Sequence, residues 1–466
     1  MTVATPRTRR TRPVPDLADI QGGILRAYGN DYSRTTYLFV NVAEMRTGRR
    51  WLGHLVDDVT SARSWTEGKP ATTLNVALTY DGLRALGLSP ELLATFSDEF
   101  RAGMAARAAQ LGDVGTSAPE HWDTPARAHV ILVVNALSED DLTGRLADLR
   151  ADLGRYNGLS LVHQEHASLL PGMREHFGFA DGFAQPAVEG VTDEKAPGGG
   201  VRDKDGWRGL ALGEFVLGYP DESGRDRNGQ DLPRAPAGPL GRNSTYGVWR
   251  KLEQDVALFR ETLRTFAAAF PGGDEEKLAA KIVGRWRNGT PIVRSPDSPA
   301  VGFRGDEPGA NDFLYHDVDA DGRRCPLGAH IRRCNPRDSI GFGELLSFRH
   351  RMLRRGVPYG PPLPPEATGP DGHKRGLIFV CYVASISRQF ESVQVQWLED
   401  GNVFGLGRDK DFLLRGPADG SGKMTVPGEP PFFLGPQPTF VTTRGGQYLF
   451  VPGITGLGAV AAGTAG

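Results

Sequence analysis

The chain has 466 residues, which at roughly 150 residues per domain suggests two or three domains, each large enough for its own core. The formal net charge is −2, and 24% of the residues are charged. This balance gives no support to a nucleic-acid-binding protein, which would carry a basic surface. The three cysteines are too few for a disulfide framework and favour a reducing compartment. No apolar run approaches the roughly 18 residues of a membrane-spanning helix, so we expect a cytoplasmic protein without a membrane partner.

The start of the chain is basic and rich in proline, and we expect residues 1–15 to form a disordered tail. The pair Arg9 and Arg10 resembles the beginning of a twin-arginine export signal. Such a signal needs an apolar segment next, and the chain places Pro13 and Pro15 there instead. Export is therefore the weaker interpretation of this segment.

The N-terminal half alternates strand patterns with helix patterns. Three short segments rich in β-branched and aromatic residues predict strands at 35–42, 76–80 and 128–134. An aspartate and a glycine bound a short predicted helix over 81–87. A serine followed three positions later by an acidic residue resembles a capping box, and leucines spaced by three or four continue it as a helix over 138–153. This order is typical of an α+β domain.

The C-terminal half begins after a long segment of weak periodicity. Residues 190–243 are rich in Gly, Pro and Asp, which predicts loops with short embedded elements. Apolar residues spaced by four and three predict a core-facing helix over 248–266. Strand patterns return at 376–382 and 447–451, and the last residues, rich in Gly and Ala, predict a tail without structure. Two α+β halves fit this order better than one continuous sheet.

In the segment 325–337, which reads C-P-L-G-A-H-I-R-R-C-N-P-R, one histidine follows a few apolar residues and precedes several arginines. A haem is a flat apolar disc with two carboxylates, and it needs a neutral imidazole on the iron and cations near its edge. His330 and the arginines that follow it match this need. Taken alone, a structural histidine in a basic surface turn explains the segment better.

An isolated carboxylate lies in the loop Gly-Phe-Ala-Asp-Gly that begins at Gly178. Asp181 is the acidic residue of this loop, and its simplest role is a turn in which it bonds its own backbone. The same turn suits a cofactor site, because glycines permit close approach of the backbone. The carboxylate would then point into a cavity.

An arginine pair follows an apolar step at Met352-Leu-Arg-Arg-Gly. Two adjacent arginines usually lie on a solvated surface, but the apolar step predicts a short strand whose first arginine, Arg354, turns inward. On the next predicted strand, Leu377 and Phe379 are spaced two apart and share one face. That face forms either the wall of an apolar pocket or ordinary core.

Together, these motifs resemble the dye-decolorizing peroxidases, specifically the longer-chain branch of bacteria and fungi. The resemblance covers nearly the whole chain, and its motifs follow one another in order. The matching segments are 19–25, 178–186, 213–220, 240–243, 325–337, 352–360, 385–390 and 440–445.

The resemblance implies an α+β fold of two ferredoxin-like domains, each an antiparallel sheet with packed helices. The first would span 16–238 and carry the distal aspartate loop, and the second would span 239–466 and hold one haem b per chain. No C-x-x-C-H motif is present, so we expect no covalent attachment through that motif.

The resemblance also assigns roles at the iron. His330 matches the proximal iron ligand, Asp181 the distal aspartate and Arg354 the distal arginine. The aspartate would move a proton between the two oxygens of hydrogen peroxide. The arginine would stabilise the negative charge that develops as the O–O bond breaks.

Further residues are assigned by the same resemblance. Leu377 and Phe379 match the apolar distal wall, and Arg332 is the expected propionate partner. Glu391 is the expected carboxylate that orients the proximal histidine. Family members often carry a basic or polar residue where this chain has Ala180, which puts hydrogen bonding near the haem edge in doubt.

The implied function is a haem peroxidase that uses hydrogen peroxide to oxidise dyes, phenols and other small aromatic reductants by one-electron steps. A haem-binding or haem-delivery protein without turnover is one alternative. It would need His330 and Arg332, whereas Asp181 and Arg354 would serve no purpose in it. A dedicated biosynthetic haem oxidase that acts on one metabolite is the other alternative, and the variable loops would decide between it and a general peroxidase.

Overall fold

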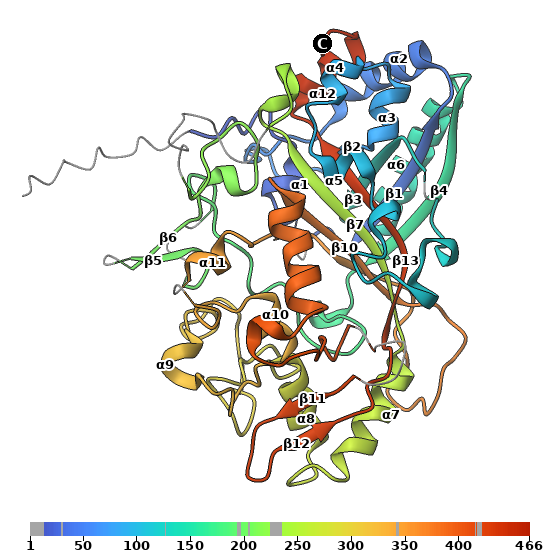
Figure 1. Ribbon diagram of the computed structural model, residues 1–466. Helices are drawn as coiled ribbons and strands as arrows, with labels where there is room; N and C mark the ends of the chain where they lie inside the picture. Colours follow the sequence, from blue (N-terminus) through green and yellow to red (C-terminus); the bar gives the residue numbers. More distant parts are fainter. Residues whose placement is uncertain are drawn as a thin grey trace, which may run out of the picture.

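The fold combines one extended antiparallel sheet with helices and long loops (Figure 1). The computed structural model describes residues 14–28, 31–125, 127–192, 197–203, 206–223, 235–341, 344–414, 416 and 422–466. Apart from its last two residues, the predicted tail over 1–15 lies outside the described residues. No helix within the described ranges is both long enough and apolar enough to cross a membrane.

The N-terminal half of the sheet has the strand order β4-β1-β3-β2, with all its pairs antiparallel. Its strands are β1 (Arg34–Val42), β2 (Thr72–Leu78), β3 (Val130–Ala136) and β4 (Leu159–Ser168). The strands predicted from β-branched and aromatic residues are confirmed, with ends that differ by a few residues. Side chains on both faces of β1, β2 and β3 are buried, which is why these strands are rich in apolar residues, whereas the edge strand β4 is largely exposed.

The C-terminal half has the strand order β13-β7-β10-β8, and β9 pairs with the other part of β10. Its strands are β7 (Thr245–Gln254), β8 (Leu353–Arg354), β9 (Val357–Tyr359), β10 (Gly376–Val383) and β13 (Val441–Val451). The predicted strands at 376–382 and 447–451 are confirmed as parts of β10 and β13.

A single pair joins the two halves. Phe450 of β13 lies opposite Leu78 of β2, so the strands of both halves form one path of neighbours. The predicted α+β class with antiparallel sheets is confirmed. The two halves predicted by the sequence are present, but they share one sheet through this pair. The domain boundary at 238/239 falls between β6 and β7 and stays a prediction.

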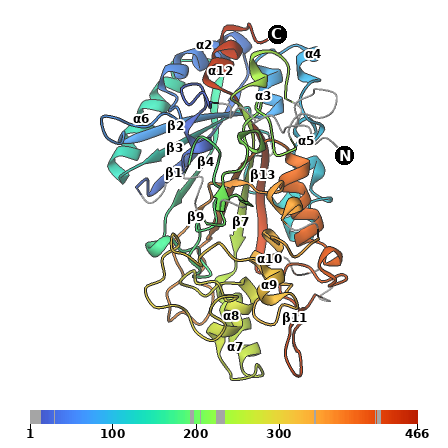
Figure 2. The same ribbon diagram turned by 90° about the vertical axis from the view of Figure 1, so that its left-hand side faces the viewer.

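Helices cover the N-terminal half of the sheet at one end of the molecule (Figures 1 and 2). Ser138 caps α6 (Glu139–Leu153) by accepting a hydrogen bond from Asp141 N, as the capping pattern predicts. The predicted unstructured end is wrong, because residues 454–462 form α12 (Ile454–Ala462), which packs against α2 (Met45–Leu55). Its Gly and Ala content hid the helix, but small residues allow the two helices to approach closely.

The predicted helix over 248–266 is partly wrong. Its first part is β7, and only the second part is α7 (Val256–Ala267), which begins at the side-chain cap of Asp255. β7 lies between β13 and β10 and is buried on both faces over most of its length, so its apolar residues do not alternate. Apolar spacing alone cannot distinguish such a strand from a helix. α7 and α8 (Glu275–Val283) pack together at the opposite end of the molecule from α2 (Figure 1).

The other elements are short. A helix with π-type hydrogen bonds follows β10 over Ile386–Glu391 and Val393–Leu398. Apart from several 3-10 turns, the remaining short helices and strands of the described residues are α1 (Gly22–Leu25), α3 (Tyr80–Ala85), α4 (Pro90–Leu93), α5 (Asp98–Ala102), α9 (Tyr315–Asp319), α10 (His330–Cys334), α11 (Leu345–Phe348), β5 (Val201–Asp203), β6 (Gly206–Arg208), β11 (Met424–Val426) and β12 (Phe432–Leu434).

Candidate active site

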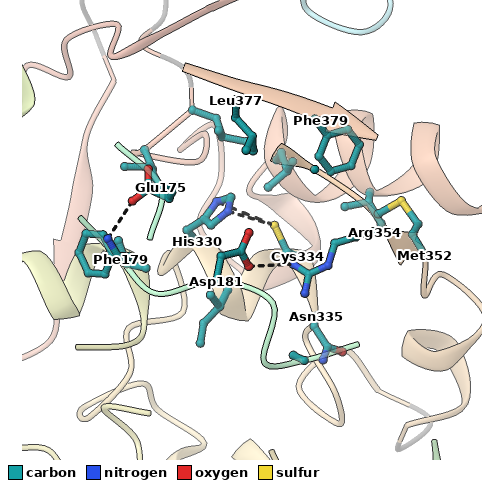
Figure 3. A pocket seen from close by; sticks show the side chains of 18 of the residues that line it. Glu175, Phe179, Asp181, His330, Cys334, Asn335, Met352, Arg354, Leu377 and Phe379 are labelled. Carbon is teal, nitrogen blue, oxygen red and sulfur yellow. Dashed lines mark hydrogen bonds and ion pairs between the residues drawn. The ribbon is translucent and has the colours of Figure 1, made fainter. Parts of the chain in front are cut away.

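A cavity of about 300 Å³ lies beside the C-terminal half of the sheet. β7 and β10 supply one wall, and α10, the π-type helix and the loop after Glu175 supply the others. Most of the lining is apolar, while two histidines, several arginines and two carboxylates also face the space (Figure 3). The cavity thus combines the properties of an apolar cofactor site with a few charged groups.

His330 begins α10, and its imidazole faces the cavity. Its Nδ1 lies 3.0 Å from Oδ2 of Asp411, a carboxylate with no solvent exposure. The other oxygen of Asp411 accepts hydrogen bonds from Leu413 N and Leu414 N, at 3.1 and 2.9 Å. Because the carboxylate holds Nδ1, Nε2 is the nitrogen left for a metal ion in the cavity.

Asp411 is held as an anion. Burial alone would raise the pKa of its carboxyl, but His330, Arg333 and the backbone hydrogen bond from Leu414 hold that pKa below its ordinary value. A negative charge on the far side of an imidazole makes the free nitrogen a stronger ligand.

Glu391 does not have the predicted role of orienting His330. Its carboxylate binds Arg107 through two hydrogen bonds of 2.6 Å and accepts a third, of 2.7 Å, from the hydroxyl of Tyr448. The helix that follows β10 directs this side chain toward Arg107 and toward Tyr448 of β13. No distinct sequence motif marks Asp411, which lies 81 residues after His330.

Asp181 and Arg354 meet in the cavity, as the sequence predicts. Oδ1 of Asp181 lies 3.8 Å from Nη1 of Arg354, and Figure 3 shows the two side chains pointing toward one another. Oδ1 also accepts a hydrogen bond of 2.6 Å from Gly182 N. Arg354 belongs to β8, and its backbone N–H donates to the side chain of Gln185 at 3.2 Å. The aspartate loop and β8 are therefore connected directly.

Glu175 shapes the loop that carries Asp181. Its carboxylate accepts hydrogen bonds of 2.9 Å from Phe177 N and Phe179 N, and a third of 2.6 Å from the side chain of Gln254. Burial raises the pKa of this carboxyl. Gly178 has a φ of +95°, a conformation that side chains with a Cβ rarely adopt, so the first glycine of the motif is needed for the turn.

Leu377 and Phe379 line the cavity from alternate positions of β10. Figure 3 shows both side chains near Arg354 and His330. This placement agrees with the prediction that they form one apolar face.

Arg332 does not line the cavity, contrary to its predicted role as a propionate partner. Its guanidinium is buried and donates to the carbonyl oxygens of Asp319 and Cys325, at 3.0 and 2.8 Å, and it lies over the ring of Tyr315. In a helix, residues two apart point to opposite faces, whereas residues four apart share a face. Accordingly Cys334, four residues after His330, lines the cavity with its Sγ 3.6 Å from Nε2.

Besides Arg250 and Arg354, three arginines line the cavity in place of Arg332. Arg285, Arg337 and Arg351 donate to backbone carbonyls, and within the described ranges no carboxylate forms an ion pair with any of them. Burial, and then the charge of neighbouring arginines, lowers the pKa of Arg285 to about 10 and that of Arg351 to about 9. Such an excess of buried positive charge indicates an anionic group in this part of the cavity.

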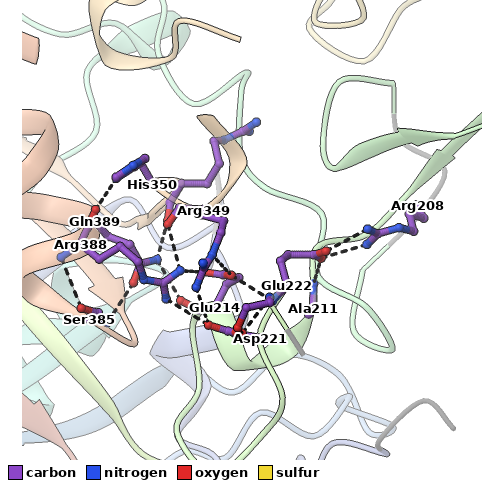
Figure 4. A network of polar contacts seen from close by, with 12 residues as sticks. Arg208, Ala211, Glu214, Asp221, Glu222, Arg349, His350, Ser385, Arg388 and Gln389 are labelled. Atoms are coloured by element: carbon purple, nitrogen blue, oxygen red, sulfur yellow. Dashed lines mark hydrogen bonds and ion pairs between the residues drawn. The ribbon is translucent and has the colours of Figure 1, made fainter. Parts of the chain in front are cut away.

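A buried ionic network fixes the segment that leads into β8 (Figure 4). Glu214 has no solvent exposure and pairs with Arg388 at 2.7 Å and with Arg349 at 3.6 Å. Gln389 donates to the carbonyl oxygen of Arg351 at 2.7 Å and to that of Glu214 at 2.9 Å. Through these bonds the network holds the backbone that presents two cavity-lining arginines.

Known proteins resemble this chain in both sequence and structure. A family model described as the DyP dimeric alpha+beta barrel domain matches residues 19–156. A dye-decolorizing peroxidase of Mycena epipterygia is 30% identical over 96% of this chain and 87% of its own length. The multifunctional dye peroxidase DyP2 of an Amycolatopsis species is 30% identical over 94% of both chains.

A solved structure of a decolorizing peroxidase from Auricularia auricula-judae superposes with a TM-score of 0.80 at 26% identity, covering 96% of this chain and 100% of that chain. The similarity thus extends over both halves of the sheet and the cavity between the elements described above. On the strength of relatives that are 30% identical over nearly the whole chain, the protein belongs to the dye-decolorizing peroxidase family.

Proposed function

We propose that this protein is a haem peroxidase that uses hydrogen peroxide to oxidise dyes, phenols and other small aromatic donors. One observation carries the proposal: an imidazole anchored by a buried carboxylate and an Asp–Arg pair face the same apolar cavity. Family membership supports it, because the relatives of this chain are peroxidases by name. A haem carrier without turnover would have no use for the Asp181–Arg354 pair.

The cavity residues fit one non-covalent haem b. His330 Nε2 is the nitrogen available to the iron, and Leu377 and Phe379 belong to the apolar wall that a porphyrin needs. Arg285, Arg337 and Arg351 supply cations without carboxylate partners in the described part of the chain, which suits two propionates. When bound, haem supplies the redox chemistry, taking two oxidising equivalents from peroxide and passing them to donors one at a time.

The protein's own contribution is proton transfer and charge stabilisation. Within the described residues, Oδ2 of Asp181 forms no hydrogen bond, whereas Oδ1 is held by Gly182 N and lies near Arg354. We assign to Oδ2 the proton that leaves one peroxide oxygen and is returned to the other, which departs as water. The guanidinium of Arg354 stabilises the negative charge on the departing oxygen.

A cytoplasmic location stays a prediction, and one structural feature supports it. Cys325, Cys334 and Cys381 are all unpaired. Free thiols persist in a reducing compartment.

The test of the proposed function is an absorption spectrum of the protein purified after expression with added haem. We expect a Soret band that bleaches and shifts with one equivalent of hydrogen peroxide, and that recovers when a dye is added and decolorised. A Soret band that does not change when peroxide is added would favour the haem carrier. Absence of any Soret band would contradict the assignment of His330.

A further inference from the structure

A second cavity, of about 170 Å³, adjoins the active-site cavity. Arg354 and Gly356 belong to the walls of both cavities, so the second one lies directly behind the distal arginine. β1, β3 and β10 supply one side of it, and the segment after α1 supplies the other. We call it the tyrosine cavity, because the rings of Tyr28, Tyr32, Tyr37 and Tyr382 line it.

Two hydroxyl groups of the tyrosine cavity have no hydrogen-bond partner among the residues that the structure describes. Tyr32 donates to the carbonyl oxygen of Pro70 at 2.7 Å, and Tyr28 donates to the side chain of Asn75 at 3.1 Å. Tyr37 and Tyr382 are only 2% and 6% exposed, yet neither hydroxyl forms a hydrogen bond to any residue that the structure describes. Because a buried hydroxyl without a partner is costly, these two groups indicate a hydrogen-bonding guest.

The charges on the wall select a neutral guest. None of the described lining residues is an aspartate or glutamate, and Arg354 and Arg355 are the charged ones. Arg355 already donates to the carbonyl oxygens of Gly23 and Ile24, at 3.2 and 2.8 Å, and Arg354 lies near Asp181. A cation would find no counter-charge here, and an anion would find no free guanidinium.

The size and the surface of the wall select an aromatic guest. The cavity volume of about 170 Å³ is close to the roughly 150 Å³ of an apolar cavity that holds benzene. Tyrosine rings and aliphatic side chains such as Val133 and Val380 make up most of the lining, which suits a flat ring better than a cluster of water molecules. Burial raises the pKa of Tyr382 to about 12 and that of Tyr37 further, so both hydroxyls stay protonated.

We propose that the tyrosine cavity binds one small neutral phenol, with its ring among the tyrosine rings and its hydroxyl shared between Tyr37 and Tyr382. The role of this phenol as a reductant rests on the proposed peroxidase function, whereas its binding does not. A donor held here lies next to Arg354, which also lines the active-site cavity.

Binding is tested by calorimetric titration of the haem-loaded ferric protein with phenol and with benzene. We expect the native protein to prefer phenol. Tyr37→Phe and Tyr382→Phe each keep the ring but remove its hydroxyl. Each should therefore weaken the affinity for phenol about fivefold and leave the affinity for benzene unchanged. Tyr80→Phe is the matched control, because Tyr80 lines neither cavity.

The proposal would be overturned if the native protein and a variant with both Tyr37→Phe and Tyr382→Phe bound phenol with equal affinity. It would also be overturned if the native protein bound phenol no more tightly than benzene. A crystal soaked in 4-bromophenol gives an independent measurement that needs no variant. The bromophenol should lie in the tyrosine cavity with its oxygen between the two hydroxyls, and only water there would overturn the site. A Soret band that does not change when peroxide is added would instead contradict the peroxidase function, and it would not affect the conclusion about phenol binding.

Discussion

Oδ2 of Asp411 lies 3.0 Å from Nδ1 of His330, although 81 residues separate them in the chain. The carboxylate is fully buried and is itself held by two backbone N–H groups. It therefore fixes both the ring orientation and the tautomer of the imidazole, and it adds negative charge behind the metal-binding nitrogen. This pair determines how strongly the free nitrogen of His330 donates electron density to a metal ion.

Replacing Asp411 by asparagine should keep the hydrogen-bond geometry but remove the charge. We expect Asp411→Asn to bind haem, to show a higher ferric/ferrous reduction potential and to lose about 10- to 100-fold in peroxidase activity. Spectroelectrochemical titration measures the potential. Asp317→Asn, at an exposed position, is the control. An unchanged potential in the Asp411 variant would mean that the carboxylate does not act on the iron through His330.

The distal pair should be needed for the reaction with peroxide and not for haem binding. We expect Asp181→Asn and Arg354→Leu to retain the Soret band and to react with hydrogen peroxide about 10²- to 10⁴-fold more slowly. Stopped-flow mixing measures this rate. If both variants reacted at the native rate, neither residue would have its proposed role.

Short motifs were enough to predict the residues whose position depends on local backbone structure. Asp181 is presented by a glycine-bounded loop, Arg354 by the start of a strand, and Leu377 and Phe379 by strand alternation. These local patterns determine in which direction each side chain points relative to its neighbours in the sequence. Their meeting in one cavity came from the family resemblance, since no local pattern determines distance between segments.

The missed residues depend on tertiary geometry. Asp411 reaches His330 only through the path of the chain after the π-type helix, and Glu391 is turned toward Arg107 by that same helix. Arg332 was misassigned because the segment after His330 was not recognised as a helix, whose rotation sends residue i+2 to the opposite face. Likewise, α12 has no polar stripe to mark it, because one side packs on α2 and small residues fill the rest.

His330 should be indispensable for haem binding. We expect His330→Ala to lose the Soret band, or to hold haem so loosely that gel filtration removes it, because the proximal ligand is gone. Absorption at the Soret band relative to 280 nm measures retention. His316→Ala alters an exposed histidine and should retain haem fully. A normal Soret band in the His330 variant would contradict the ligand assignment.

The cavity arginines should hold the haem in place of Arg332. We expect Arg337→Gln and Arg351→Gln each to speed haem loss about tenfold, because each removes a charge-assisted contact to a propionate. Transfer of haem to an excess of apomyoglobin measures the rate. Arg332→Gln should instead lower the melting temperature without changing haem loss, since its guanidinium binds carbonyls outside the cavity. Faster haem loss in the Arg332 variant alone would restore the sequence-based assignment.

His176 should make the fold sensitive to acid. Its side chain is 7% exposed, and Nε2 lies 2.8 Å from the carbonyl oxygen of Tyr359. Burial lowers its pKa from the ordinary 6.5 to about 4. Between these two pH values the imidazole is protonated in the unfolded chain but stays neutral in the folded protein. Stability is therefore lost as the pH falls from 6.5 to 4, by up to about 3 kcal/mol.

Replacing this histidine with glutamine removes the titrating group and should flatten that part of the pH profile. Differential scanning calorimetry at pH 7 and pH 4.5 measures the change in melting temperature. His373→Gln alters an exposed histidine and should follow the native profile. If His176→Gln also followed the native profile, the loss of stability in acid would come from other groups, and the buried imidazole next to β9 would have no part in it.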